Sequence, residues 1–531
     1  MQFACAAAFG LFCTAEAVRA EDAMGPLSVC PGNPRYFCEP SGNAVFLAGA
    51  HTWNNLVDMG AKHPPPEFVF EAYLDFLESH HHNTIRLWTW ETAKPEDWFD
   101  TPLRGVATPL VWARSGPGLA NDGLPRFDLE RFNAEYFSRL KQRVAKARAR
   151  GFYVIVVLFE GWSVQLSPGR NTHPFHPDNN INDTSFLNDV EEIHSLKHPE
   201  ILAIQERYVE EVIDTLAGMD NLLFEIVNEA GGYSTEWQYH MIEFVRSRLD
   251  AHGYRAPVGM SFQHRNGDNA ALFASPADWI APGAHPGFYR TNPAVARGAK
   301  VIIADTDHLA GSSLVDPVWP YKALLRGLNV LYMDRYFGSS SVSTEHVNAA
   351  PAIRANIGTA RLLADLLQIR EAVPKTNVSS SRYALVADDW MLVLAPDAQR
   401  LEVDLRDYAG QMGAVWIDIL RKRLITADAV ETGDFSGFYP PVRGGALLYL
   451  RRARSAAPRL ESIGPDISAT AAASVQYTDI QTRLRSMVSP WLSLIGRNYS
   501  NLAVTLIATG LLGLLAGISV AYVVLRSRWR R

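Results

Sequence analysis

Cysteine is scarce in this chain of 531 residues, which contains four cysteines in all. Cys5 and Cys13 lie in an apolar segment at the N-terminus, so only Cys30 and Cys38 remain in the body of the chain. These two lie close together in a stretch rich in proline and glycine. We therefore predict one small loop disulfide formed in an oxidising compartment. Two unpaired thiols are the alternative.

An excess of positive charge is also missing. The chain has 50 Lys and Arg against 56 Asp and Glu, and its net charge of −6 is spread along the sequence without a basic stripe. This pattern excludes a nucleic-acid partner. We find no internal repeat and no long low-complexity tract, and we expect no cofactor. A chain of this length is too long for one core, so two or more folded units are expected.

The N-terminus has no lysine or arginine before its apolar stretch, Phe3 to Ala17, although a basic residue normally opens a secretory signal. The stretch is otherwise typical of a signal peptide, and a small residue, Ala20, precedes a plausible cleavage point at Glu21. We therefore predict that residues 1–20 are a signal peptide and that the chain is exported.

Charge is absent from the segment Leu502 to Leu525, which is long enough to span a bilayer. Four arginines follow it, at positions 526, 528, 530 and 531. Because positive charge stays on the cytoplasmic side, residues 526–531 are predicted to be a cytoplasmic tail and 502–525 a transmembrane helix. The partner implied by this segment is the cell membrane. Residues 453–501, rich in Ser, Ala and polar residues, are expected to form a stalk.

Short apolar runs alternate with longer amphipathic stretches through the first two thirds of the chain. Several runs are apolar at nearly every position, which is typical of parallel strands covered on both faces. Leu129–Arg150 and Pro199–Ala217 have helical spacing. Eight such units favour a (β/α)8 barrel, a TIM barrel of α/β class, over residues 21–340. The predicted strands are Ala44–Ala50, Thr84–Trp90, Tyr153–Glu160, Leu222–Asn228, Pro257–Gln263, Trp279–His285, Val301–Asp305 and Val330–Asp334.

The pattern changes after Tyr336. Glu345 to Leu367 is predicted to form one or two helices, and the chain then alternates with turn signals as antiparallel strands do. Residues 341–452 are therefore predicted to be a helical connection followed by a small antiparallel β-sandwich. Its expected strands are Tyr383–Val386, Trp390–Leu394, Leu401–Leu405, Ala414–Ile419 and Ala446–Leu450.

Polar and aromatic residues fall where the predicted barrel strands end, which is the face on which barrels of this kind build active sites. The chain also has 13 Trp and 19 Tyr, and flat rings can stack on sugar faces. The site candidates at these strand ends are His51, Trp53, Arg86, Trp88, Glu160, Trp162, Asn228, Glu229, His285, Asp305, Asp307 and His308.

The fourth predicted strand ends in Asn228-Glu229, and this pair resembles the acid/base signature of the large clan of retaining (β/α)8 glycoside hydrolases. The resemblance implies that Glu229 is the general acid/base and that Asn228 binds the sugar 2-hydroxyl. The clan's nucleophile, a Glu after the seventh strand, is missing here. Asp305 follows that strand most directly and is the expected nucleophile, with Asp307 the second choice.

Because Asp is shorter than Glu, the distance between the two carboxyl groups could exceed that of retaining enzymes, which leaves a water-mediated inverting mechanism open. A third possibility is that Asp305, Asp307 and His308 bind a divalent cation, but their spacing fits no specific metal signature, so no metal is predicted.

The other candidates on this face have supporting roles, and a structural role is the open alternative for each of them. Two of these roles follow from the same resemblance. Arg86 corresponds to the arginine that keeps the nucleophile ionised, and His285 to a residue that contacts it. Trp53, Trp88 and Trp162 are candidate stacking platforms. His51 and Glu160 are candidate ligands of sugar hydroxyls, and His308 is a further substrate contact.

Arg35 to Gly49, with His51-Thr52-Trp53, is similar to the opening of cellulase-like and apiosidase-like barrel proteins. Many of these carry a C-terminal β-sandwich described as collagen-binding, and Tyr383 onward resembles it. The resemblance covers about residues 35–452. It implies a membrane-anchored, extracytoplasmic glycoside hydrolase that cleaves O-glycosidic bonds of a poly- or oligosaccharide.

Two alternatives remain open. The first is a non-catalytic surface protein that binds carbohydrate or matrix on a degenerate hydrolase barrel, and the missing strand-seven Glu favours it. The second is a scaffold for polysaccharide export, in which the barrel only holds the polymer.

Overall fold

The computed structural model describes residues 25–94, 105–284, 288–289, 291–309, 316–334 and 344–452. The predicted signal peptide, stalk, transmembrane segment and basic tail lie outside these residues. Within the described part of the chain, no helix is both long and apolar enough to cross a bilayer. The barrel and the sandwich fall within one compact unit.

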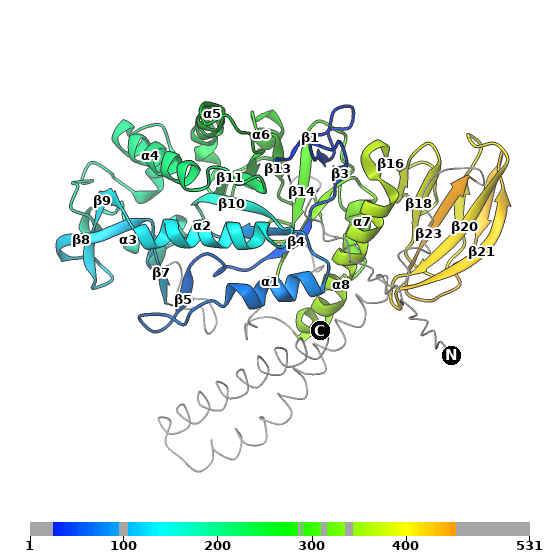
Figure 1. Cartoon of the computed structure of the whole chain (residues 1–531), viewed down its shortest axis with the longest axis horizontal. Helices are drawn as coiled ribbons and strands as arrows, with labels where there is room; N and C mark the ends of the chain where they lie inside the picture. Colours follow the sequence, from blue (N-terminus) through cyan, green and yellow to red (C-terminus); the bar gives the residue numbers. More distant parts are fainter. Residues whose placement is uncertain are drawn as a thin grey trace, which may run out of the picture. The chain divides into compact units, whose positions relative to one another are not determined.

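Eight parallel strands close into a barrel in the order β10-β11-β12-β13-β14-β15-β4-β6, as the sequence predicts (Figure 1). Three predicted strands have the predicted bounds, and the other five are shorter or shifted at their ends. The strands are β4 (Ala48–His51), β6 (Thr84–Leu87), β10 (Tyr153–Glu160), β11 (Leu222–Asn228), β12 (Val258–Ser261), β13 (Trp279–Ala281), β14 (Val301–Asp305) and β15 (Asn329–Met333). Every residue of β10 and β11 is buried, because helices cover the outside of the barrel while side chains fill its inside.

Helices surround the barrel strands (Figure 1). They are α1 (Phe70–Ser79), α2 (Ala134–Arg148), α4 (Pro199–Thr215), α5 (Thr235–Ala251), α6 (Asn269–Ala274), α7 (Trp319–Leu324) and α8 (Thr344–Leu367). Helix α2 begins where Asn133 caps it by accepting a hydrogen bond from the backbone N–H of Glu135 (3.1 Å). The predicted helical stretch therefore starts a few residues too early, since Leu129 to Phe132 lie in a strand.

Helix α8 completes the barrel, although the sequence placed it in the connection to the sandwich. Gly358 lies so close to the backbone carbonyl of His80 that a Cβ there would be 1.9 Å from it. Arg354 on this helix is buried and donates to both carboxylate oxygens of Asp334 (2.5 and 2.6 Å). The helix follows the last barrel strand and packs on the barrel, so the barrel extends beyond residue 340.

The loops after β4 and β6 carry strands that the sequence did not predict. Strand β5 (Asp58–Gly60) pairs with β7 (Val106–Thr108), and β8 (Trp112–Leu119) pairs with β9 (Pro125–Phe132), both antiparallel. A short 3-10 helix, η1 (Ser163–Gln165), and helix α3 (Ser167–Thr172) follow β10, and two further 3-10 turns, η2 (Pro177–Asn179) and η3 (Val190–His194), precede α4. These insertions enlarge the face on which the strands end.

The opposite end of the barrel is closed by a small sheet of β1 (Ser28–Val29), β2 (Phe37–Cys38) and β3 (Ala44–Val45). Leu27, Phe37 and Leu47 pack against the first residues of barrel strands, such as Tyr153 and Val301. The predicted disulfide between Cys30 and Cys38 is present, with Cα atoms 4.9 Å apart.

The loop that this disulfide closes contacts the connection between the barrel and the sandwich. The side-chain amide of Asn33 donates to the carbonyls of Arg370 (2.7 Å) and Ala372 (3.0 Å). Arg35 donates from Nε to the carbonyl of Ala296 (2.9 Å) on the barrel. The N-terminal loop thus holds the segment that leads out of α8.

The second set of strands is antiparallel, as predicted, and its core lies between two sheets. The larger sheet has the order β16-β17-β18-β23-β20-β21, and the smaller one pairs β19 with β22. The strands β16, β21 and β22 were not predicted. The bounds are β16 (Val373–Lys375), β17 (Ala384–Val386), β18 (Trp390–Ala395), β19 (Leu401–Asp404), β20 (Gln411–Asp418), β21 (Arg423–Glu431), β22 (Phe435–Phe438) and β23 (Ala446–Arg452).

Candidate active site

Asp305, the last residue of β14, points into the barrel and is 1% exposed. Its Oδ1 lies 3.0 Å from Nε2 of His51, the last residue of β4, and accepts the backbone N–H of Asp307 at 2.9 Å. Burial opposes ionisation of Asp305, but His51, His308 and Arg86 outweigh it and hold its pKa well below the usual range. Asp305 is therefore ionised near pH 7, and its other oxygen, Oδ2, has no hydrogen-bond partner among the described residues.

Arg86 on β6 is the cation at the centre of the barrel. It donates to both carboxylate oxygens of Glu225 (2.7 and 2.6 Å) and to the side-chain oxygen of Asn228 (2.8 Å). Its remaining nitrogen, Nη1, lies 3.7 Å from Asp305 and 3.9 Å from Asp307. Burial disfavours its charge, but Glu225 and the two aspartates raise its pKa. Arg86 does face the predicted nucleophile, but its bidentate partner is Glu225.

Glu229 follows β11 and is partly exposed at the mouth of the barrel. Its backbone has a φ of +50°, a left-handed value that costs energy for any residue with a Cβ. The side-chain amide of Gln165 donates to its carbonyl (2.8 Å) and supports this conformation. Burial, then the charges of Asp307 and Glu160, raise the pKa of Glu229 well above the usual value. Glu229 therefore stays protonated in conditions that ionise an ordinary glutamate.

The ends of β10 and β11 lie very close together. The backbone N–H of Gly161 donates to the carbonyl of Asn228 (2.8 Å), and a Cβ at Gly161 would be 2.5 Å from the Cα of Ala230. Only glycine allows this approach, so Gly161 helps to place Glu229 beside the end of β10.

Glu160 was a candidate sugar ligand with a structural role as the alternative, and its contacts are those of a structural residue. Its carboxylate is fully buried and accepts hydrogen bonds from the backbone N–H groups of Trp162 (3.1 Å) and Ser163 (2.9 Å), from the Ser163 hydroxyl, and from the side-chain amide of Asn228 (3.0 Å). Four donors satisfy this carboxylate. Its role in this structure is to hold η1 and to orient Asn228.

Behind Glu160 lies a second buried carboxylate. Glu91 accepts the backbone N–H of Glu160 (2.7 Å), and its oxygens are 3.6 Å from Nε2 of His173 and 3.8 Å from Nε2 of His194. Burial raises its pKa, but the two imidazoles outweigh this and lower the pKa to about 2. Glu91 thus helps to fix the end of β10.

The three tryptophans proposed to stack on sugars differ in exposure. Trp88 is 2% exposed, stacks on His51 with ring centroids 5.3 Å apart, and carries the Arg86 guanidinium 4.5 Å from its ring centre. It offers no free face to a sugar and instead packs the centre of the site. Trp53 and Trp162 are partly exposed, as a stacking platform must be.

His308 is buried, and its Nε2 lies 3.4 Å from the side-chain oxygen of Asn228. Burial lowers its pKa, so the ring is neutral near pH 7. His285 lies outside the described residues. In the described part of the chain, no group of three His, Cys, Asp or Glu side chains has the arrangement of a metal site.

Sequence reasoning missed Glu225, Glu91, His173 and His194. The sequence did contain a signal for Glu225. It is a single acid inside the apolar run of β11, and a carboxylate that is buried in a strand covered on both faces needs a cation as its partner. Glu91 and the two histidines come from loops, where spacing carries no information about contacts.

Comparison with known proteins agrees with this architecture. A family model described as a domain of unknown function, DUF6298, matches residues 107–272, which include Glu160, Asn228 and Glu229 but not Asp305. A search of curated proteins finds no match.

Two solved structures share the fold over most of the chain. A protein titled glycoside hydrolase has 14% sequence identity and a TM-score of 0.52, covering 81% of this chain and 98% of its own. A glycoside hydrolase of family 5 from Bacteroides vulgatus has 13% identity and a TM-score of 0.53, covering 82% and 95%. The chain therefore has the (β/α)8 fold of these glycoside hydrolases.

Proposed function

We propose that this chain is a glycoside hydrolase in which Glu229 is the general acid/base and Asp305 the nucleophile. The observation that carries the proposal is the opposite displacement of two carboxyl pKa values at one barrel mouth. The pKa of Glu229 is raised by burial and by Asp307, whereas that of Asp305 is lowered by His51 against the effect of burial. An acid that keeps its proton beside a carboxylate that has lost its own is the arrangement that glycosidic cleavage requires.

In this mechanism Glu229 protonates the leaving oxygen while Asp305 attacks the anomeric carbon. The bond from carbon to the leaving oxygen breaks as the bond to the Asp305 oxygen forms, and water later cleaves the intermediate with Glu229 acting as base. His51 and Arg86 stabilise the Asp305 carboxylate, and Asn228, held by Arg86 and Glu160, is placed to bind a substrate hydroxyl.

Asp307 is the second candidate nucleophile, and two observations favour it. Its side chain is 15% exposed, against 1% for Asp305, and it is the strongest of the charges that raise the pKa of Glu229. Both aspartates lie near the same nitrogen of Arg86, so the kinetics of single variants must separate them.

The experiment that tests the function is a product screen. Purified protein is incubated with a panel of poly- and oligosaccharides, and released sugars are separated by chromatography, with Glu229→Gln as the control. The proposal expects products from the wild type on at least one glycan and none from the variant. Binding of a glycan without any products would instead support the non-catalytic alternative, a carbohydrate-binding protein on a degenerate barrel.

The pH dependence of kcat/KM should follow from the two displaced pKa values. Because the pKa of Glu229 is raised, its acidic form should persist well above the range of an ordinary glutamate, about pH 4.3, and activity on natural glycans should fall only on the alkaline side. Because the pKa of Asp305 is lowered, no loss should appear on the acidic side down to about pH 4. A wild-type profile in which kcat/KM decreases as the pH is lowered below 6 would contradict the assignment.

We also propose that residues 502–525 anchor the protein in the cell membrane with the barrel outside and the arginine-rich tail in the cytoplasm. The apolar length of the segment and the arginines behind it support this proposal. Protease added to intact cells should then release the barrel while an epitope at the C-terminus stays protected. A barrel that resists cleavage until the cells are lysed would contradict this orientation.

A further inference from the structure

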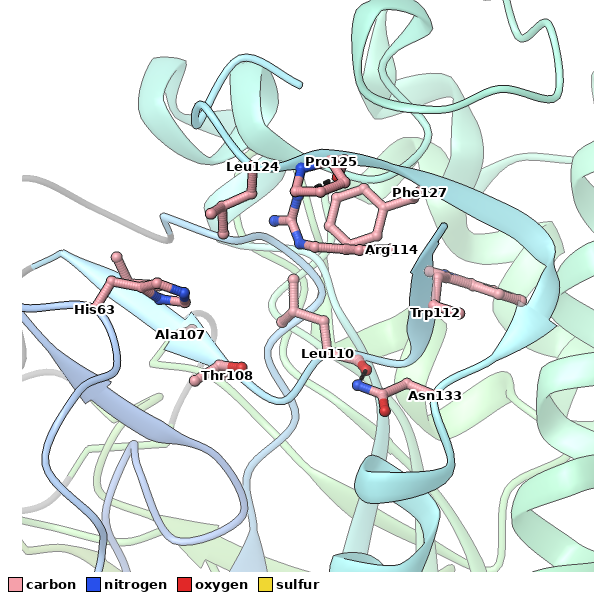
Figure 2. A pocket seen from close by; sticks show the side chains of 12 residues that line it. His63, Ala107, Thr108, Leu110, Trp112, Arg114, Leu124, Pro125, Phe127 and Asn133 are labelled. Atoms are coloured by element: carbon pink, nitrogen blue, oxygen red, sulfur yellow. Dashed lines mark hydrogen bonds between the residues drawn. The ribbon is translucent and has the colours of Figure 1, made fainter. Parts of the chain in front are cut away.

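A pocket of about 340 Å³ lies between the β5–β7 pair and the β8–β9 pair, outside the candidate active site (Figure 2). Figure 2 shows His63 on one side of it, Leu110 and Arg114 across from His63, and Thr108 below. Its volume is in the range of small-molecule sites, about 300–1,000 Å³.

The pocket belongs to the same face of the barrel as the carboxylates. Its walls come from the loops after β4 and β6, and loops that follow barrel strands build the catalytic face. A short chain of contacts links the two places: the backbone N–H of Ala107, in the pocket wall, donates to Ala93 (2.9 Å), and Glu91, two residues before Ala93, accepts the N–H of Glu160 (2.7 Å).

The chemistry of the walls fits a ligand without charge. Among the described residues that line the pocket, Arg114 is the one with a permanent charge, and Asp122 pairs with it through both carboxylate oxygens, one of them at 3.3 Å. Arg114 also donates to the carbonyl of Pro125 (2.9 Å), and its guanidinium carbon lies 3.9 Å from the centre of the Phe127 ring. The wall therefore presents a neutralised guanidinium and apolar side chains, with the hydroxyl of Thr108 and the imidazole of His63 as polar groups.

We infer that this pocket binds one neutral sugar unit of a glycan chain, at a distance from the bond that is cut. A sugar ring has apolar C–H faces that pack on apolar side chains such as Leu110 and Leu124, and hydroxyls that bond to groups like Thr108 and His63. The inference rests on the proposed function for its ligand class, but it makes a separate claim, that the inserted strands bind the substrate at a place outside the active site.

The test fills the pocket without touching the carboxylates. Ala113, which lines the pocket on β8, is changed to Phe, and Ser115, an exposed residue two positions further along the same strand and outside the pocket, is changed to Phe as the matched control. Both changes are made in the Glu229→Gln background. Binding of neutral hexasaccharides (β-1,4-linked glucose, mannose, xylose and galactose) is measured by calorimetry.

The expected result is that the wild-type pocket binds at least one hexasaccharide and that Ala113→Phe weakens this binding about tenfold, the value of one lost stacking and hydrogen-bonding contact. Ser115→Phe should bind as the parent does. When Ala113→Phe is made in the active protein, which keeps Glu229, it should leave kcat/KM on a small aryl glycoside unchanged, because such a substrate does not reach the pocket.

Equal binding by Ala113→Phe and its parent, or no binding of any hexasaccharide by the parent, would overturn the inference. So would an equal loss on the small aryl glycoside, since this would show a general distortion. If Ala113→Phe does not fold, His63→Ala decides, because His63 is exposed and its loss should still weaken hexasaccharide binding about threefold. Failure of the proposed function is distinguishable: wild type would release no product, while the binding measurements would stand.

Discussion

Replacement of Asp305 by alanine should abolish turnover of both an activated aryl glycoside and a natural glycan, by about four orders of magnitude or more. The reason is that both substrates need the carboxylate that attacks the anomeric carbon, and a better leaving group does not compensate for its loss. Glu229→Ala should behave differently. Because an activated aryl group needs little protonation, this variant should keep appreciable activity on the aryl glycoside and lose about 10²- to 10⁴-fold on glycan. Added azide should restore part of the lost turnover by replacing water as the nucleophile.

Asp307→Ala is the matched control for the nucleophile, because Asp307 lies beside the same nitrogen of Arg86. It should lose activity by a smaller factor. An inactive Asp307→Ala beside an active Asp305→Ala would move the nucleophile two residues along the chain. Wild-type turnover of glycan by all three variants would show that the two-carboxylate site is wrong.

The largest effect on stability should come from Arg86→Met. This change leaves Glu225 buried without its bidentate partner, and such an unpaired buried charge costs about 3–5 kcal/mol. Unfolding by urea, followed by circular dichroism, should show a loss of this size for the barrel transition.

Arg148→Met provides the comparison, because Arg148 makes an equally short pair with Asp220 (2.6 Å) at the surface, where its side chain is 46% exposed. Its cost should be about 0–1 kcal/mol. The double variant Arg86→Met, Glu225→Leu should recover much of the loss, because it removes the unpaired charge. Equal losses for Arg86→Met and Arg148→Met would contradict the view that burial determines the value of the central pair.

The sequence predicted the barrel well because its strands carry a strong local signal. A run such as Val154 to Leu158 is apolar at each position and has few alternatives to a buried parallel strand. Because the ends of the eight predicted strands meet at one face of a barrel, the strand bounds alone predict that five side chains share this face: Asp305, His51, Arg86, Asn228 and Glu229.

What the sequence could not predict was the pairing of these side chains. Arg86 was expected to serve the nucleophile, but Glu225 takes two of its hydrogen bonds, because the two residues face each other across β10 in the closed barrel. The sequence left Glu160 open between a sugar ligand and a structural residue, and in the structure the turn after β10 places two backbone N–H groups and a serine hydroxyl on its carboxylate. Such contacts depend on barrel closure and loop course, which no short window of sequence encodes.

The loop closed by Cys30 and Cys38 has a consequence for how the protein is produced. Through Asn33 and Arg35 it holds the connection at Arg370 and Ala372 to the barrel. In a reducing cytosol the loop would lose its covalent closure, and the segment leading into the sandwich would lose a rigid support. Protein made there should still contain a barrel competent for small substrates, but with a sandwich that samples a wider range of positions. Expression in an oxidising compartment is therefore a condition for any measurement that depends on how the sandwich is held to the barrel.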